Sequence, residues 1–466
     1  MAAKWKPANL GPLTLSRAWS ELKERERMNS KTVFLTGATG VIGSRLAPLF
    51  LKEPGTRLCL LIRAKSDSHL HERLGELSDF WQLDCAEHLR SGRLRVLKGD
   101  SWLPRMGLSD EVFTRLAGEV THIVDAAGNV KFNQPMDEAL AHTMCGIENA
   151  VELARLAQKN GQFVKLDWVS TVGVTGRLPG LLREEAVTVS REFHNTYEAS
   201  KARAEEFLLA QMSAGLPATI HRPSMVVGDS LTGRIIHYQV FYHVCEFLSG
   251  LRTLGFVAES SGHKLDIVPV DYVSHAIHLA SGRPDTIGRI FNLCSGPELA
   301  VSLASLTGEI RRMMAAKGVR LPRLHEIPPK WIARVAPALS CLLPARPRRM
   351  IASLPLFLTY IGESQGFDNS GSLAFFKREG LSLPLPQDYL STVLECYLGG
   401  KKKVEAARKL KAPKMMRGRL SGNSYGFSGS GRNQNRTEHA VWVSGVNHTG
   451  RPATMGRSGN ADDRVR

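Results

Sequence analysis

A glycine-rich turn near the start of the chain constrains the fold more than any other feature. The apolar run "KTVFLTG" predicts a buried strand that ends at Gly37, and "VIGSRLAPLFLK" predicts a helix directly after it. Gly37, Gly40 and Gly43 mark the connection between these two elements. Glycines allow a tight backbone turn, and the N-terminus of a helix favours negative charge. The turn therefore predicts a β–α unit whose backbone closely approaches a pyrophosphate.

Further apolar runs alternate with helical patterns up to about residue 225. The helical pattern "GIENAVELARLAQKN" separates two of these runs. The strand candidates that follow the first one are "RLCLLIR", "LRVLKGD", "THIVDAAG", "FVKLDWVS" and "PATIHRP". Strands that alternate with helices indicate a parallel sheet that is covered on both faces. The sequence thus predicts an α/β fold built on a Rossmann-type, doubly wound parallel sheet.

The end of the second predicted strand indicates which dinucleotide would bind. Folds that bind NAD usually place an acid here to hold the ribose hydroxyls, but "LLIRAKS" has Arg63 and no acid before Asp67. An arginine can bond a 2′-phosphate through two N–H groups, and Lys65 and Arg45 are candidate helpers. The sequence therefore favours NADPH over NADH, with a solvated arginine as the alternative interpretation.

A second motif, "NTYEASK", lies where a helix is predicted to begin. Asn195 is expected to cap this helix, and Glu198 follows three residues later as in a capping box. Tyr197 and Lys201 are four residues apart, so they would share one face of the helix. A cation beside a phenol lowers its pKa, which would make Tyr197 a proton donor or acceptor near neutral pH. Taken alone, the spacing also fits two unrelated surface residues.

These motifs together resemble the extended short-chain dehydrogenase/reductases. The resemblance rests on the glycine-rich turn, on "DWVSTVGVTG" after a later strand and on "NTYEASK". The chain is more closely similar to the thioester-reductase and fatty acyl-CoA reductase branch, which has a male sterility-like NAD-binding domain. The segments that carry this narrower resemblance are "LLIRA", "GNVKF", "RPSMVVGDSLTG" and "LDIVPVDYVSHAI". The resemblance covers residues 31–400 in scattered motifs.

The resemblance implies a role for each residue that matches the family pattern. Thr171, Tyr197 and Lys201 would form the catalytic triad, with Ser170 as the weaker candidate for the hydroxyl position. Lys201 would also hold the nicotinamide ribose, and Arg63 would hold the 2′-phosphate. The other residues expected to bind the cofactor are Gly37, Thr39, Gly40, Val41, Ile42, Gly43, Asp100, Ala126, Ala127, Pro223 and Ser224.

Two positions depart from the family pattern. Thr143 stands where an asparagine is often found in the central helix, and Gly128 stands where a larger residue is common. That asparagine usually supports a network near the catalytic lysine, so both departures concern the proton relay and the rate of the reaction.

The domain organisation follows from where the strand–helix alternation ends. We expect an N-terminal extension over 1–30 and an NADP-binding Rossmann domain over 31–225. A smaller, mostly helical substrate lobe is expected over 226–400, interleaved with the last Rossmann strands, and it should contain a helix over 233–252. Residues 401–466 are rich in glycine, serine and basic residues, which predicts a disordered basic tail.

The resemblance implies hydride transfer from NADPH to an acyl thioester, giving an aldehyde or, after a second hydride, an alcohol. The expected partner is a fatty acyl-CoA or a carrier-protein-bound acyl group. Residues 331–360 would line a channel for the acyl chain or form ordinary helical core. Arg346, Arg348 and Arg349 would meet phosphates or belong to a solvated loop. The alternatives are an extended reductase or epimerase acting on a ketone, sterol or sugar nucleotide, and a non-catalytic NADP-binding scaffold.

The composition of the chain indicates its cellular compartment and the kinds of partner it would bind. Of the net charge of +17, +11 lies in residues 401–466, so no nucleic-acid binding is expected for the folded part. The seven cysteines are scattered without a CxxC pair, which fits a reducing compartment and predicts no zinc site. The sequence shows neither a signal peptide nor a run of 18 apolar residues. We therefore expect a cytoplasmic protein without a membrane span, and peripheral membrane contact stays open.

Overall fold

The structure is a computed structural model, and it describes most of the chain between residues 31 and 411. The described residues are 31–130, 134–251, 253–259, 262–328 and 365–411. The expectations for the N-terminal extension, for the 331–360 segment with its three arginines and for the tail beyond Lys411 therefore lie outside the described residues.

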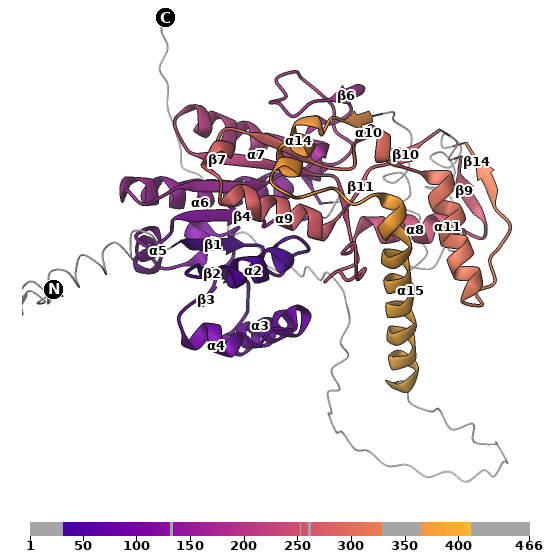
Figure 1. Ribbon diagram of the computed structural model, residues 1–466, viewed down its shortest axis with the longest axis horizontal. Helices are drawn as coiled ribbons and strands as arrows, with labels where there is room; N and C mark the ends of the chain where they lie inside the picture. Colours follow the sequence, from indigo (N-terminus) through magenta and orange to yellow (C-terminus); the bar gives the residue numbers. More distant parts are fainter. Residues whose placement is uncertain (1–30, 131–133, 252, 260–261, 329–364, 412–466) are drawn as a thin grey trace, which may run out of the picture. The chain divides into compact units, whose positions relative to one another are not determined.

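Seven parallel strands form one sheet within the described residues, in the order β12-β7-β5-β4-β1-β2-β3 (Figure 1). These strands are β1 (Thr32–Thr36), β2 (Arg57–Ile62), β3 (Leu94–Lys98), β4 (His122–Asp125), β5 (Lys165–Val169), β7 (Ala218–Pro223) and β12 (Ile290–Leu293). All six strands predicted up to residue 225 are present. Their apolar runs are continuous because both faces of the sheet are covered, which confirms the Rossmann-type fold.

Helices cover the two faces of the sheet. Adjacent residues of β1 point to opposite faces, so Val33 and Leu35 join one hydrophobic core and Phe34 joins the other. The first core is shared with α2 (Gly43–Lys52), α3 (Asp67–Trp81), α4 (Cys85–Arg90), α9 (Val270–Ser281) and α14 (Ser370–Arg378). The second core is shared with α5 (Asp110–Ala117), α6 (Met136–Lys159) and α7 (Thr196–Ser213).

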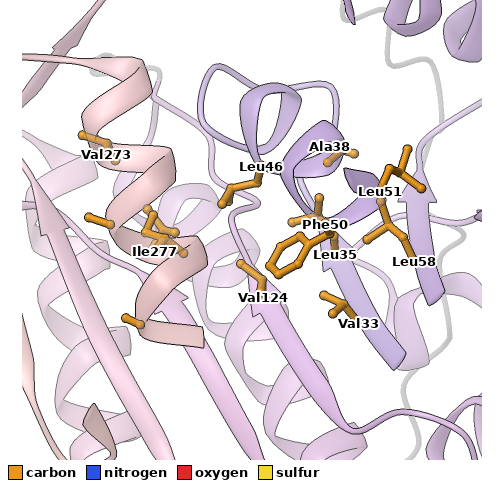
Figure 2. Close-up of a cluster of buried hydrophobic side chains, with 14 of the residues drawn as sticks. Val33, Leu35, Ala38, Leu46, Phe50, Leu51, Leu58, Val124, Val273 and Ile277 are labelled. Atoms are coloured by element: carbon orange, nitrogen blue, oxygen red, sulfur yellow. The ribbon is translucent and has the colours of Figure 1, made fainter. Parts of the chain in front are cut away.

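Figure 2 shows how the first core holds the glycine-rich turn in place. Leu46 and Phe50 of α2 lie between the sheet and the side chains of Val273 and Ile277 on α9. These four side chains are fully buried. Helix α2 is thus packed against both the sheet and α9, which fixes the position of its N-terminus at the end of β1.

The chain order places a crevice between β1 and β4. The chain leaves β1 toward β2 on one side and later returns to β4 on the other side, and both strands pair with β1 in parallel. Ligands of open α/β sheets bind outside the carboxyl ends of the strands at such a switch point. The topology therefore predicts the site at the ends of β1 and β4.

A smaller lobe is built from segments after β7. Its elements are β8 (Met225–Val227), α8 (Val240–Leu248), β9 (Phe256–Ala258), β10 (Lys264–Leu265), β11 (Ile267–Pro269), β13 (Val301–Ser302), α11 (Leu303–Ala316), β14 (His325–Ile327) and α15 (Pro386–Lys411). Its core includes Phe241 and Val244 of α8 together with Tyr389 and Val393 of α15. Helix α8 is shorter than the helix expected over 233–252, because the preceding residues form a loop.

The last described helix crosses the expected domain boundary. Helix α15 ends at Lys411, whereas the folded part was expected to end near residue 400. Among the described residues, neither α15 nor any other helix is both long and apolar enough to span a membrane.

Candidate active site

The glycine-rich turn is shaped by close backbone packing. Gly37 has φ +69°, and a Cβ there would overlap the carbonyl oxygen of Ala126 at the end of β4. A Cβ at Gly43 would overlap the carbonyl oxygen of Gly37. Gly40 donates its N–H to that same oxygen at 2.8 Å and lines the cleft described below. Gly37 and Gly43 therefore set the shape of the turn, and Gly40 lies where the turn borders the cleft.

One cleft of about 520 Å³ collects most of the residues predicted for the site. Thr171 follows β5, and Tyr197 and Lys201 occupy the first turns of α7. The other predicted residues that line this cleft are Gly40, Val41, Ile42, Ala126, Ala127, Pro223 and Ser224. Gly37, Thr39, Gly43, Arg63 and Asp100 do not line it. The cleft thus joins the glycine-rich turn to the triad.

The N-terminus of α7 has the expected cap. Asn195 Oδ1 accepts the N–H of Glu198 at 2.9 Å, which holds Tyr197 in the first helical turn. Thr171 accepts the N–H of Gly173 at 3.2 Å, and its hydroxyl is hydrogen-bonded to the Tyr197 phenol. The neighbouring Ser170 instead donates to the buried Glu205 at 2.6 Å. This arrangement favours Thr171 over Ser170 as the hydroxyl partner of Tyr197.

The electrostatics of Tyr197 differ from the expectation. Burial and the Glu198 carboxylate raise the pKa of the phenol, and only the hydrogen bond with Thr171 lowers it. The prediction that Lys201 would lower this pKa is wrong, because Lys201 is not among the groups that shift it. Lys201 Nζ instead donates to Val169 O at 2.8 Å and lies 4.5 Å from the centre of the Trp168 ring.

Lys201 is itself perturbed by its surroundings. Burial lowers its pKa from 10.5 to about 8, although the carboxylates of Asp125 and Glu205 oppose this shift. Asp125 is also buried, and it accepts a short hydrogen bond from Thr36 at the end of β1. Lys201 is therefore mostly protonated at neutral pH and loses its charge in mildly alkaline solution.

Two arginines gather near the end of β2. Arg63 is 59% exposed, with its guanidinium 3.6 Å from the carboxylate of Asp100 and 4.9 Å from the centre of the Trp102 ring. Arg73 of α3 donates to Arg63 O at 2.5 Å and to Thr39 Oγ1 at 3.0 Å. Burial and the like charge of Arg63 lower the pKa of Arg73. The sequence analysis missed Arg73, since its helical pattern gives no sign that it reaches the glycine-rich turn.

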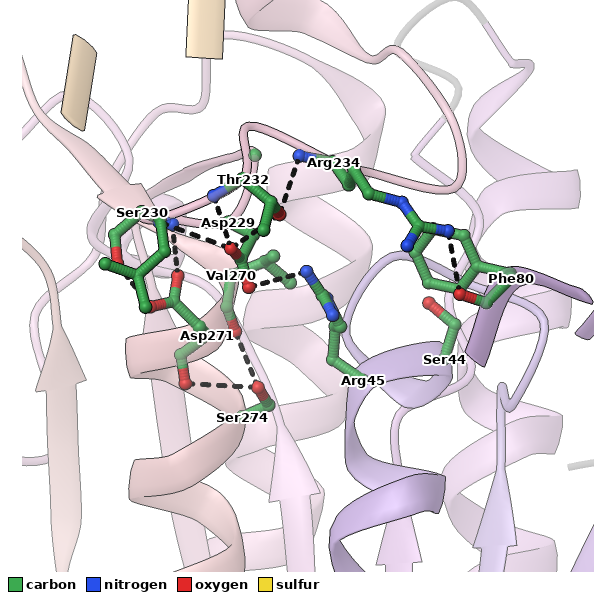
Figure 3. Close-up of polar contacts among 12 residues, drawn as sticks. Ser44, Arg45, Phe80, Asp229, Ser230, Thr232, Arg234, Val270, Asp271 and Ser274 are labelled. Carbon is green, nitrogen blue, oxygen red and sulfur yellow. Dashed lines mark hydrogen bonds and ion pairs between the residues drawn. The ribbon is translucent and has the colours of Figure 1, made fainter. Parts of the chain in front are cut away.

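The candidate helper Arg45 is engaged elsewhere, as Figure 3 shows. Its guanidinium pairs with Asp229 at 2.5 Å and lies over the ring of Phe80. Arg234 donates to Phe80 O at 3.0 Å, and His237 Nε2 lies 3.2 Å from Thr39 O. The "GDSLTG" segment and the residues after it therefore contact α2, α3 and the glycine-rich turn.

The two departures from the family pattern lie beside Lys201. Thr143 donates to Ser200 Oγ at 3.1 Å, and Ser200 donates to Tyr197 O at 2.9 Å. A Cβ at Gly128 would lie 3.8 Å from Lys201 Nζ. Thr143 thus contacts α7 through a serine, and Gly128 leaves space at the lysine.

The lobe supplies a polar wall that the sequence analysis did not identify. Gln239, His263, Lys264 and Asp266 line the same cleft. Asp266 accepts the backbone N–H groups of Ser295 and Gly296 at 2.8 and 2.9 Å, and burial raises its pKa to about 6. These residues lie far along the chain from the triad, and Asp266 belongs to the motif "LDIVPVDYVSHAI" although no role was predicted for it.

Comparison with known proteins identifies the family. The male sterility protein family of NAD-binding domains matches residues 35–277, which is just over half of the chain. The chain belongs to this family. Its first strand, its triad residues and the helix α9 beside the glycine-rich turn all lie within or at the edge of the matched region.

Proteins named as reductases and as peptide synthetases are among the curated proteins that the chain resembles. A carboxylic acid reductase of Mycobacterium tuberculosis is 28% identical over 359 residues, which cover 71% of this chain and 30% of that protein. The nonribosomal peptide synthetase asaC of Aspergillus flavus is 27% identical, covering 56% of this chain and 26% of that protein. The chain thus spans about a quarter to a third of the length of these curated relatives.

A solved structure has the same fold over most of the chain. The terminal R domain from the myxalamid PKS-NRPS biosynthetic pathway has a TM-score of 0.64 and 26% identity, and the match covers 83% of this chain and 93% of that domain. The reductase domain of a nonribosomal peptide synthetase from Mycobacterium tuberculosis has a TM-score of 0.62 and 20% identity. The fold is therefore that of an extended reductase domain.

Proposed function

We propose that this chain is an NADPH-dependent reductase of acyl thioesters in which Thr171, Tyr197 and Lys201 act at the reacting carbonyl. One observation carries the proposal: the three side chains line a single cleft with Gly40, and Thr171 is hydrogen-bonded to Tyr197. The similarity to a carboxylic acid reductase and to terminal R domains supports the choice of a thioester as substrate.

The residues present fit a dinucleotide with a 2′-phosphate. A Cβ at Gly37 or at Gly43 would overlap backbone atoms, and the tight turn that results suits a pyrophosphate held by backbone N–H groups. Arg63 and Arg73 supply two guanidinium groups near the end of β2, where the adenosine ribose of such a cofactor lies. The bound cofactor would supply the hydride.

In the proposed reaction, side chains of the protein donate the proton and stabilise the developing negative charge. Tyr197 donates its phenolic proton to the carbonyl oxygen, and burial keeps the phenol protonated until that step. Thr171 donates a hydrogen bond to the same oxygen. Protonated Lys201 places a positive charge near the developing oxyanion, where preorganised charge is worth most.

We also propose that the two domains bind different ligands. Residues 31–225 would bind the cofactor and residues 226–400 would bind the acyl thioester, because the lobe supplies the polar wall of the cleft. The cleft volume of about 520 Å³ lies within the usual range for small-molecule sites. Its substrate would be an acyl-CoA or an acyl group on a carrier protein.

A substrate panel tests the proposal. Purified protein is incubated with NADPH and acyl-CoA thioesters, carrier-bound acyl thioesters, aldehydes, ketones or sugar nucleotides, and products are identified by mass spectrometry. We expect aldehyde or alcohol from the thioesters only when NADPH is present. Turnover of ketones alone would favour the other extended reductases. Tight NADPH binding without turnover of any substrate would favour a scaffold.

A further inference from the structure

A histidine–carboxylate pair lies directly beside the triad and has no role in the hydride step. Glu198 Oε2 accepts the backbone N–H of His194 at 3.0 Å and lies 2.8 Å from His194 Nδ1. Both residues line the cleft that holds Tyr197 and Thr171. The side chains of His194 and Glu198 are only 3% and 1% exposed. Such a pair is held in one orientation and shielded from bulk water.

The position of this pair is set by the same elements that set the triad. Glu198 directly follows Tyr197 on α7, and its N–H is capped by Asn195. A Cβ on Gly173 would lie 2.9 Å from Glu198 Cγ, so the segment after Thr171 packs directly on Glu198. The pair therefore lies next to both members of the Thr171–Tyr197 hydrogen bond.

Thioester reduction needs a second proton that Tyr197 cannot supply. In the first half of the proposed reaction, hydride adds to the carbonyl carbon and Tyr197 protonates the oxygen, giving a hemithioacetal and a tyrosinate. In the second half, Tyr197 takes back the hydroxyl proton, the C–S bond breaks and its electron pair goes to sulfur. The aldehyde leaves as a thiolate departs, and a different group must protonate that sulfur.

We propose that His194, oriented by Glu198, is the acid that protonates the departing thiol sulfur. A carboxylate on Nδ1 fixes the imidazole tautomer and stabilises the charge on the ring when it is protonated. The imidazolium gives its Nε2 proton to sulfur, which yields aldehyde, thiol and neutral imidazole, and water then restores the proton. Glu198 is a positioning residue in this step. The inference rests on the proposed thioester reduction.

The test uses the fact that only a poor leaving group needs an acid. The variant His194→Gln keeps a polar side chain of similar size. It is compared with wild type on three substrates of one chain length, which are the acyl-CoA, the S-phenyl thioester and the free aldehyde. Thiophenol is the more acidic thiol, so its thiolate leaves without protonation. The aldehyde has no sulfur at all.

We expect His194→Gln to slow reduction of the acyl-CoA by at least ~100-fold, the low end for a lost general acid. Reduction of the S-phenyl thioester and of the aldehyde should change by less than about threefold. Glu198→Gln should show the same pattern with a smaller loss. His263→Gln, which changes a histidine on the lobe side of the same cleft, should not separate the three substrates.

Two outcomes would overturn the inference. One leaves the proposed thioester reduction standing, and the other rejects both. If His194→Gln slows all three substrates equally, or none of them, His194 does not protonate sulfur, while thioester reduction by the wild type stands. If the wild type reduces neither thioester, the proposed function fails and this inference fails with it. Melting temperatures of the variants show whether each is folded.

Discussion

The two ends of the proposed cofactor site differ in how their charges are exposed. At the β2 end, Arg63 is 59% exposed and faces Asp100, which is 23% exposed. At the triad, Lys201 is 4% exposed and its pKa falls to about 8. An exposed charge acts chiefly by attracting a charged partner, whereas burial changes the proton affinity of a charged group. The first end is thus suited to selecting the cofactor, and the second to moving protons.

The largest expected effect tests the buried end. Tyr197→Phe should cut turnover at least ~100-fold, the scale for a lost general acid, because no other tyrosine among the described residues lines the cleft. Binding of NADPH should stay nearly intact, since the glycine-rich turn and the arginines are unchanged. Steady-state kinetics and fluorescence titration with NADPH measure the two effects.

The matched control for that variant is Tyr272→Phe. Tyr272 is buried in the first core against Phe376 and does not line the cleft. This variant should retain wild-type turnover. Unchanged turnover in Tyr197→Phe would remove Tyr197 from the mechanism.

The exposed end is tested by Arg63→Ala. Charge-assisted bonds to a phosphate are worth about 1.5–3 kcal/mol each, so the KM for NADPH should rise roughly 10- to 100-fold. The KM for NADH should change little, because NADH has no 2′-phosphate. Arg57→Ala, at the opposite end of β2, is the control and should leave both values unchanged. Equal weakening of both cofactors by Arg63→Ala would contradict a role in selecting NADPH.

The pH dependence of NADPH binding tests whether the charge on Lys201 contributes to binding at the buried end of the site. Lys201 loses its proton above pH about 8, so the Kd for NADPH should rise by about tenfold between pH 7 and pH 9. Lys201→Arg keeps its charge over this range and should give a flat profile. The charged groups that act on Lys201 are Asp125 and Glu205. A wild-type profile as flat as that of the variant would show that the charge on Lys201 does not contribute to binding.

The same shift affects stability. The unfolded chain keeps this lysine protonated up to its ordinary pKa of 10.5, whereas the folded chain releases the proton near pH 8. The contribution of Lys201 to folding stability should therefore rise with pH between about 8 and 10.5. Below pH 8 Lys201 is protonated in both the folded and the unfolded chain, so burial of its charge lowers the free energy of unfolding by its full amount, which no longer depends on pH.

The smallest expected effect comes from removing residues 412–466. This segment lacks the apolar periodicity that builds a core, so its deletion should leave turnover and melting temperature unchanged. A deletion of residues 386–466 is the contrasting variant, because it removes the buried Tyr389, Val393 and Leu394 from the core of the lobe. That variant should lose the cooperative unfolding of the lobe. A large drop in melting temperature for the shorter deletion would place the end of the fold beyond residue 411.

Local sequence was sufficient for six of the seven strands of the sheet and for part of the site, whereas β12 was not predicted. Each of the six strands was predictable because a strand buried on both faces needs a continuous apolar run. Gly37, Gly40 and Gly43 mark the turn in the sequence, and a Cβ at Gly37 or Gly43 would overlap backbone atoms. Tyr197 and Lys201 share the start of α7 because residues four apart on a helix share a face.

Only the tertiary structure shows the contacts between distant segments, because the periodicity of a sequence reports local structure alone. Arg73 reaches Thr39, Arg45 turns to Asp229, and the residues before α8 form a loop because partners from distant segments lie beside them. The pKa of Tyr197 rises because burial and the Glu198 carboxylate outweigh the hydrogen bond with Thr171. Helix spacing states which side chains share a face, but desolvation depends on everything that packs around them, and that is known only once the chain has folded.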